Sequence, residues 1–102
     1  MNAAIPPPVP ITSAQCRAAR ALIRWGIARL AEASGVSETT VNVFELDRRT
    51  PHPNNLAAIR AALEAAGVEF TAETDAVGPG VRLKKNASPA QRSPVEPLPE
   101  IG

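Results

Sequence analysis

The sequence has one cysteine, one histidine and no tyrosine among its 102 residues. A single cysteine excludes an internal disulfide framework, and Cys16 with His52 cannot complete the set of four ligands that a closed zinc site needs. With one histidine there is no basis for a Ser-His-Asp arrangement, and no glycine-rich loop follows a predicted strand. We therefore expect a protein that is not an enzyme and that has no metal ion or other cofactor.

Long apolar runs are also missing. No stretch approaches the run of about eighteen apolar residues that a membrane-spanning helix requires. The first residues, MNAAIPPPVPI, have no cationic start and no long apolar centre, which a secretory signal would have. We expect a cytoplasmic protein with no membrane partner.

The formal net charge is only +1, but it is unevenly distributed. Residues 12–60 hold seven arginines and four acidic residues, which gives +3. Residues 61–80 hold four acidic residues and no cation, and residues 81–102 hold four cations and two glutamates. The acidic stretch offsets the positive charge of the N-terminal half in the total. This basic half can contact phosphate groups.

Eleven prolines cluster near both ends and around positions 51 to 53. Residues 1–10 are predicted to form a disordered, Pro-rich arm. Residues 86–102 are predicted to form a disordered, Pro-rich tail, because they have too few apolar residues to bury. Between them we place a helical domain over 11–67 and a β-hairpin extension over 68–85.

The stretch ITSAQC predicts the start of a first helix. Thr12 and Gln15 have the spacing of a capping box, and Ile11 can pack on Cys16 as a hydrophobic staple. Gly26 is expected to end the helix. Its apolar stripe is predicted to consist of Cys16, Ala19, Leu22, Ile23 and Trp25. A solvated face is predicted for Arg17, Arg20 and Arg24.

Two short helices are predicted next. The first covers residues 27–34, and Gly35 follows it as a residue that adopts positive φ without cost. Ser37 can then cap a third helix that runs through Asp47. The β-branched residues within 39–43 would suit a strand, but the apolar residues nearby do not alternate, so we predict a helix. Inward positions are predicted for Ile27, Leu30, Ala31, Val36, Val41 and Phe44.

A fourth helix and a hairpin complete the prediction. Pro53 can occupy the first turn of a helix that runs to Ala66 and ends at Gly67. The alternating segment VEFTAE can pair with GVRLKK across the turn residues AVGPG. The apolar face of the helix is predicted to contain Leu56, Ile59, Leu63 and Ala66. The predicted fold class is all-α, with four principal helices and a short C-terminal β-hairpin.

Three residues around the second and third helices have the spacing of a helix-turn-helix motif. Ala31 is small where the two helices would approach most closely, Gly35 supplies the turn, and Val41 would plug the third helix onto the second. The second helix of such a motif can enter the major groove of DNA.

With these segments the chain resembles the XRE, or Cro and lambda-repressor-like, family of helix-turn-helix regulators. The resemblance runs from QCRAARALIRW through LAEASGVSETTVNVFE and RRTP to LAAIRAALEAAGVEF and GPGVRL. It implies a lambda-repressor-like domain that binds double-stranded DNA, forms a homodimer on two-fold-related half-sites, and regulates transcription.

The resemblance also implies where DNA would bind, with the helix at about 37–47 in the major groove. The residues that match its DNA-contacting face are Ser37, Glu38, Thr39, Asn42 and Val43. The residues that match a phosphate-gripping loop are Arg48 and Arg49. Their chemistry suits base edges, because Asn42 can pair with adenine, Glu38 can accept from the cytosine amino group, and Val43 or a threonine methyl can touch thymine.

Three features differ from the usual pattern of the family. Gly26 and Ile27 stand where a polar pair commonly opens the second helix, and Asp47 replaces the glycine that usually precedes the basic loop. Glu38 is repelled by phosphate unless a cytosine satisfies it. These differences keep a second hypothesis open, in which the chain is an antitoxin or another protein-interaction module with a protein partner and weak or no DNA binding.

Overall fold

The computed structural model describes residues 9–85. It contains four α-helices followed by a two-stranded antiparallel sheet, as the sequence predicts. The elements are α1 (Ser13–Ile23), α2 (Ile27–Ser34), α3 (Glu38–Glu45), α4 (Pro53–Ala65), β1 (Val68–Thr71) and β2 (Gly80–Leu83). No helix in this part of the chain has the length and apolar character needed to cross a membrane. Residues 1–8 of the predicted Pro-rich arm and the whole predicted tail, residues 86–102, lie outside the described residues.

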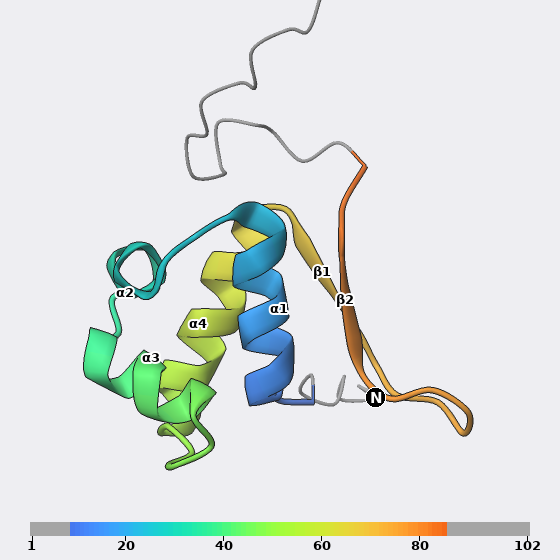
Figure 1. The fold of residues 1–102 in the computed structure, drawn as a ribbon, viewed down its shortest axis with the longest axis horizontal. Helices are drawn as coiled ribbons and strands as arrows, with labels where there is room; N and C mark the ends of the chain where they lie inside the picture. Colours follow the sequence, from blue (N-terminus) through green and yellow to red (C-terminus); the bar gives the residue numbers. More distant parts are fainter. Residues whose placement is uncertain (1–8, 86–102) are drawn as a thin grey trace, which may run out of the picture.

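The helices form a bundle with the hairpin on one side (Figure 1). In this view α1 and α4 run roughly vertically, α2 is seen end-on, and α3 runs across the lower left. The hairpin contacts α1 on the side away from α2 and α3. Because α2 and α3 cross steeply, α3 projects at one end of the bundle.

The capping box at the start of α1 is confirmed. The Thr12 hydroxyl accepts from the Gln15 N–H at 3.0 Å, and Gln15 Oε1 accepts from the Thr12 N–H at 2.8 Å. The amide nitrogen of Gln15 also donates to the carbonyls of Gly80, at 3.0 Å, and Thr71, at 3.4 Å. One buried side chain therefore joins the helix start to the loop end of the hairpin.

The end of α1 differs from the prediction. The helix ends at Ile23, and Arg24 takes the left-handed conformation with φ 59°. The N–H of Arg24 donates to the Ala21 carbonyl and that of Trp25 to the Arg20 carbonyl, which is the bonding of a Schellman motif. Gly26 is instead the N-cap of α2. This turn brings Trp25 into the core.

The turn between α2 and α3 follows the prediction. Gly35 has φ 74°, and its N–H donates to the Ala31 carbonyl at 2.9 Å. The Ser37 hydroxyl accepts from the Thr40 N–H at 3.1 Å, so it caps α3. Three residues therefore suffice to redirect the chain between two short helices.

The third helix is two residues shorter than predicted. It ends at Glu45, and Asp47 adopts a left-handed conformation with φ 59°. The Asp47 N–H donates to the Phe44 carbonyl, and the Arg48 N–H donates to the Val43 carbonyl, so a second Schellman motif closes the helix. Aspartate tolerates this conformation better than most residues.

Most predicted core positions are confirmed. Val36, Val41 and Phe44 join α3 to the core, and Leu30 and Ala31 do so for α2. The residues that α4 contributes are Leu56, Ile59, Leu63 and Ala66. The predicted α1 stripe is wrong at Leu22, which is 37% exposed, and Ile27 is only half-buried.

The start of α4 and the hairpin also match the prediction. Pro53 is the first residue of the helix, and the His52 side chain accepts from the Asn54 N–H at 3.1 Å. The strands pair with Val68 opposite Leu83 and Phe70 opposite Val81. These four side chains share the face toward the helices, because alternate residues of a strand point to the same side.

Candidate nucleic-acid interface

The outward face of α3 contains most of the residues proposed to contact DNA. Glu38, Thr39 and Asn42 are exposed, and Val43 is half-buried. The opposite face of the helix is fixed in the core through residues such as Val41, which is completely buried. The 3.6-residue period of the helix thus separates the core side from the polar side.

Ser37 has a structural task at the start of this face. Its hydroxyl accepts from the Thr40 N–H, and it also donates to Thr40 Oγ1 at 2.9 Å. The side chain is exposed but engaged by the helix that it caps. Ser37 therefore caps the start of α3, next to the residues proposed to contact DNA.

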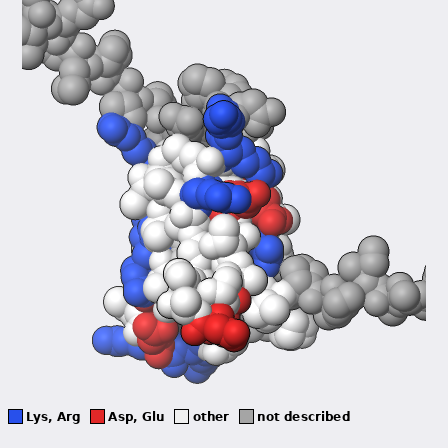
Figure 2. All heavy atoms as spheres, turned by 90° about the vertical axis from the view of Figure 1, so that its right-hand side faces the viewer, with Lys and Arg blue, Asp and Glu red and all other residues white. Residues whose placement is uncertain are grey.

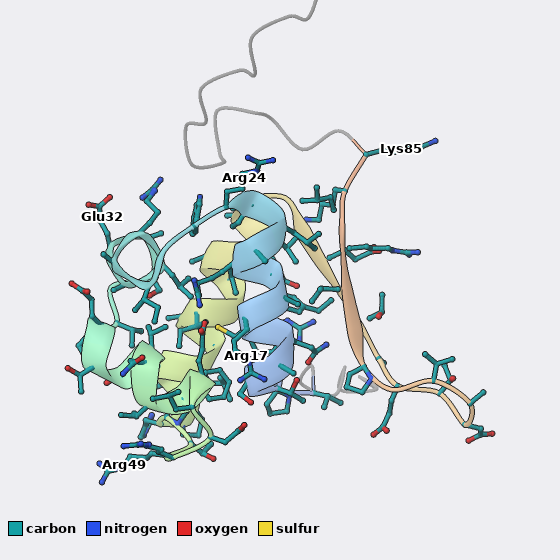
Figure 3. The ribbon with its side chains drawn as sticks, viewed as in Figure 1. Arg17, Arg24, Glu32, Arg49 and Lys85 are labelled. Atoms are coloured by element: carbon teal, nitrogen blue, oxygen red, sulfur yellow. The ribbon has the colours of Figure 1, made fainter. Side chains whose placement is uncertain are left out.

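Arg48 and Arg49 lie immediately after α3 and are both exposed. Neither guanidinium forms an ion pair or a hydrogen bond within residues 9–85. Figure 3 shows Arg49 extending from the loop below α3, away from the rest of the bundle. The two arginines and part of α3 share one shallow hollow, which is lined by Thr39, Thr40, Val43, Arg48, Arg49 and Pro51. Four of the seven predicted site residues therefore meet at one place.

Leu46 belongs to the same surface, and the prediction missed it. It is the C-cap residue of α3 and is 53% exposed. It follows Val43 by three residues and Asn42 by four, which are the spacings of neighbours on one face of a helix. From that spacing the sequence could have predicted that Leu46 lies on the outward face. The outward face therefore has a polar N-terminal half and an apolar C-terminal end.

A buried ion pair fixes α3 against α1. Glu45 is only 4% exposed, and its Oε1 and Oε2 lie 2.5 and 2.7 Å from Nη2 and Nε of Arg20. Arg17 donates to the backbone carbonyl of Glu45, and Figure 3 shows Arg17 on α1 near the C-terminal part of α3. The prediction that Arg20 lies on a solvated face is therefore wrong.

The Cys16 thiol is part of the same junction. Its Sγ donates to Glu45 Oε2 at 3.1 Å, and the side chain is completely buried. Burial, followed by the hydrogen bond to Glu45, raises the pKa of Cys16 far above its ordinary value. The hydrogen bond to Glu45 likewise raises the pKa of Arg20. The thiol is therefore a neutral donor, and the carboxylate is matched by a permanent cation.

The other acidic residues near α3 differ in how they are held. Asp47 accepts a hydrogen bond from the Ser13 hydroxyl at 2.5 Å, so its carboxylate faces the start of α1. Glu32 pairs with Arg29 at 2.9 Å. Glu38 makes no ion pair with any residue from 9 to 85. It is the acidic group that a bound polyanion would have to accommodate.

The hairpin side of the molecule has a different character. Figure 2 shows blue and red side chains scattered around a mostly uncharged surface. There the exposed pair Arg82 and Glu69 forms an ion pair across the two strands. This side offers no patch of a single sign, unlike the loop that carries Arg48 and Arg49.

The residues described in the structure include no group of three or more His, Cys, Asp or Glu side chains that could hold a metal ion. No protein-family model matches the chain, and no curated protein matches it. Function is therefore inferred from the geometry of α3 and the loop that follows it.

Proposed function

We propose that the protein is a sequence-specific DNA-binding transcriptional regulator of the XRE type, with α2 and α3 as its helix-turn-helix and α3 in the major groove. The support is geometric. α2 and α3 are short helices joined by three residues, and they cross steeply at one end of the bundle. The inner side of α3 is held by the core and by Glu45, and its outer side is open.

The observation that carries the proposal is a pair of arginines beside the outer face of α3 that have no ion-pair or hydrogen-bond partner among residues 9–85. Arg48 and Arg49 share a hollow with Thr39 and Val43, so cationic groups and groups able to touch base edges form one surface. In protein–DNA complexes, phosphate contacts set the position of the protein and base contacts give specificity. Both kinds of group are adjacent here.

The size and chemistry of α3 fit a groove. Its eight residues span about 12 Å, which is the rise of about three or four base pairs. Asn42 presents an amide suited to adenine, and Glu38 presents an acceptor suited to the cytosine amino group. A cytosine at that position would also offset the repulsion between Glu38 and phosphate.

A homodimer would extend this contact to two half-sites. In a two-fold dimer on DNA, the two copies of α3 would lie about 34 to 36 Å apart, one turn of the double helix. A dimer in which the spacing is far from this value would contradict operator binding.

The proposal is tested by selecting bound sequences from a pool of random DNA duplexes at physiological salt. We expect one sequence to be enriched, and its affinity to fall steeply as salt is raised. The double variant Arg48→Ala with Arg49→Ala should bind every duplex more weakly, and should reduce the log–log salt slope by about two for each bound subunit, because each subunit loses two phosphate contacts.

The matched control is Lys84→Ala with Lys85→Ala. It removes the same formal charge at the opposite end of the molecule, where Figure 3 shows Lys85. A salt slope that drops equally in both double variants would contradict a localised contact at Arg48 and Arg49. Enrichment of no sequence would overturn the proposal.

The second candidate is the protein-interaction module, including an antitoxin. The exposed Leu46 favours it, as does Glu38 on the same face, which has no ion-pair partner within the described part of the chain, because an apolar group beside an acid also suits a protein surface. In that case a protein partner would bind in the absence of DNA, and Leu46→Ala would weaken that binding. Binding measured by calorimetry before and after nuclease treatment separates the two candidates.

A further inference from the structure

The C-terminal end of the outer face of α3 is apolar. Leu46 is 53% exposed and has Val43 one helical turn before it. The core does not need Leu46, because Val41 and Phe44 already fill the inner side of the same helix. An exposed leucine at this point is therefore available to a ligand.

Resting on the proposed function, we infer that Leu46, together with Val43, selects a thymine by contact with its methyl group. The thymine methyl is the apolar group that a base pair presents in the major groove. The polar residue Glu38 begins α3, and Asn42 lies at its middle, one helical turn before Leu46. The helix would then read a cytosine amino group at its start, an adenine at its middle and a thymine at its C-terminal end.

Charge complementarity makes DNA the favoured occupant of this apolar end. Arg48 and Arg49 follow Leu46 closely in the chain, and they share their hollow with Val43. A ligand that covers Val43 and Leu46 must also approach these two exposed cations. Duplex DNA satisfies both, since the thymine methyl lies between two phosphate backbones.

The test uses the duplex enriched by selection and copies of it in which one thymine at a time is replaced by deoxyuridine. This change removes a single methyl group and leaves base pairing intact. We expect one position in each half-site at which the replacement weakens binding about fourfold, the value of one buried methyl group. At that position Leu46→Ala should lose most of the preference for the thymine duplex over the deoxyuridine duplex, keeping only the part that Val43 supplies.

The matched control is Leu22→Ala, which shortens another exposed leucine, on α1. It should keep the full preference for thymine, and thermal unfolding by circular dichroism should show that both variants are folded. Equal binding of all deoxyuridine duplexes by the unmodified protein would overturn the inference and leave the proposed function standing. If no duplex is enriched, both the proposed function and this inference are wrong.

Discussion

Two regions of this protein carry the same kinds of charged residue and use them in opposite ways. At the junction of α1 and α3, Arg20 and Glu45 face each other, with Glu45 buried and the Cys16 thiol bound to the same carboxylate. In the loop after α3, Arg48 and Arg49 are exposed and make no ion pair with residues 9–85. The first set of charges orients the helix, and the second is free to meet a ligand.

Charge counts along the sequence do not reveal which charged side chains are available to a ligand. Seven arginines lie within residues 12–60. Arg20 is neutralised by Glu45, Arg29 is paired with Glu32, and Arg60 is paired with Glu64. The positive charge that this half exposes to solvent therefore comes mainly from arginines that have no ion-pair partner among residues 9–85.

The largest expected effect comes from breaking the buried pair. Glu45→Ala leaves the Arg20 guanidinium without its carboxylate, and we expect the free energy of unfolding to fall by about 3 to 5 kcal/mol. Chemical denaturation followed by circular dichroism measures this change. As a control, Glu32→Ala removes an exposed carboxylate from the pair with Arg29 and should cost about 1 kcal/mol or less.

Replacing both partners of this pair with apolar residues tests whether the loss comes from the unpaired charge. Arg20→Met combined with Glu45→Leu should recover most of the loss, because no unpaired charge is left buried. If Glu45→Ala is no more harmful than Glu32→Ala, the pair does not hold α3 in place.

An intermediate effect is expected from pH. In the folded protein the pKa of Cys16 is raised, whereas the unfolded thiol ionises near its ordinary value of 9.0. The stability that comes from the neutral thiol is therefore complete below about pH 9 and is lost as the pH rises. Between about pH 9 and 10 we expect a loss of about 1 kcal/mol in the free energy of unfolding.

Cys16→Ser is the control for this loss. Serine keeps a hydrogen-bond donor for Glu45 but does not ionise in this range. The difference in stability between the two proteins should shrink with rising pH, as measured by denaturant unfolding at each pH. A constant difference would show that the thiol ionises equally in both states.

The smallest effect on stability is expected in the exposed loop. Arg48→Ala with Arg49→Ala should change the free energy of unfolding by less than about 0.5 kcal/mol, because neither side chain has a partner in the described fold. Thermal unfolding checks this. A loss above about 1 kcal/mol would mean that these arginines hold the loop in shape, and any weaker DNA binding would then be indirect.

Much of the fold was predictable because its signals are local. The capping box of Thr12 and Gln15, the cap at Ser37 and the positive φ of Gly35 each depend on residues a few positions apart. The core side of α3 was also predictable, since the spacing of Val41 and Phe44 fits a helix and not a strand. These local signals agree with the global fold, as expected for a sequence that folds well.

The missed features depend on neighbours that are distant in the sequence. Arg20 and Glu45 are 25 residues apart, so helical spacing on α1 alone could not reveal their contact. The end of α1 was misplaced because Arg24, which has no special preference for positive φ, closes the helix so that Trp25 can be buried. The exposed residues on the outer face of α3 were predicted except for Leu46, where helical spacing continues past the last regular residue.

The side chain of Gln15 sets an order of events during synthesis. Its carbonyl oxygen can bond within the capping box as soon as residues 12–15 have left the ribosome, but its amide nitrogen needs the carbonyls of Thr71 and Gly80. Those acceptors are translated 56 and 65 residues later. The first helix therefore completes its contacts only after the hairpin has been made, and a nascent chain that stops before the hairpin would present α1 without the strands that pack against it.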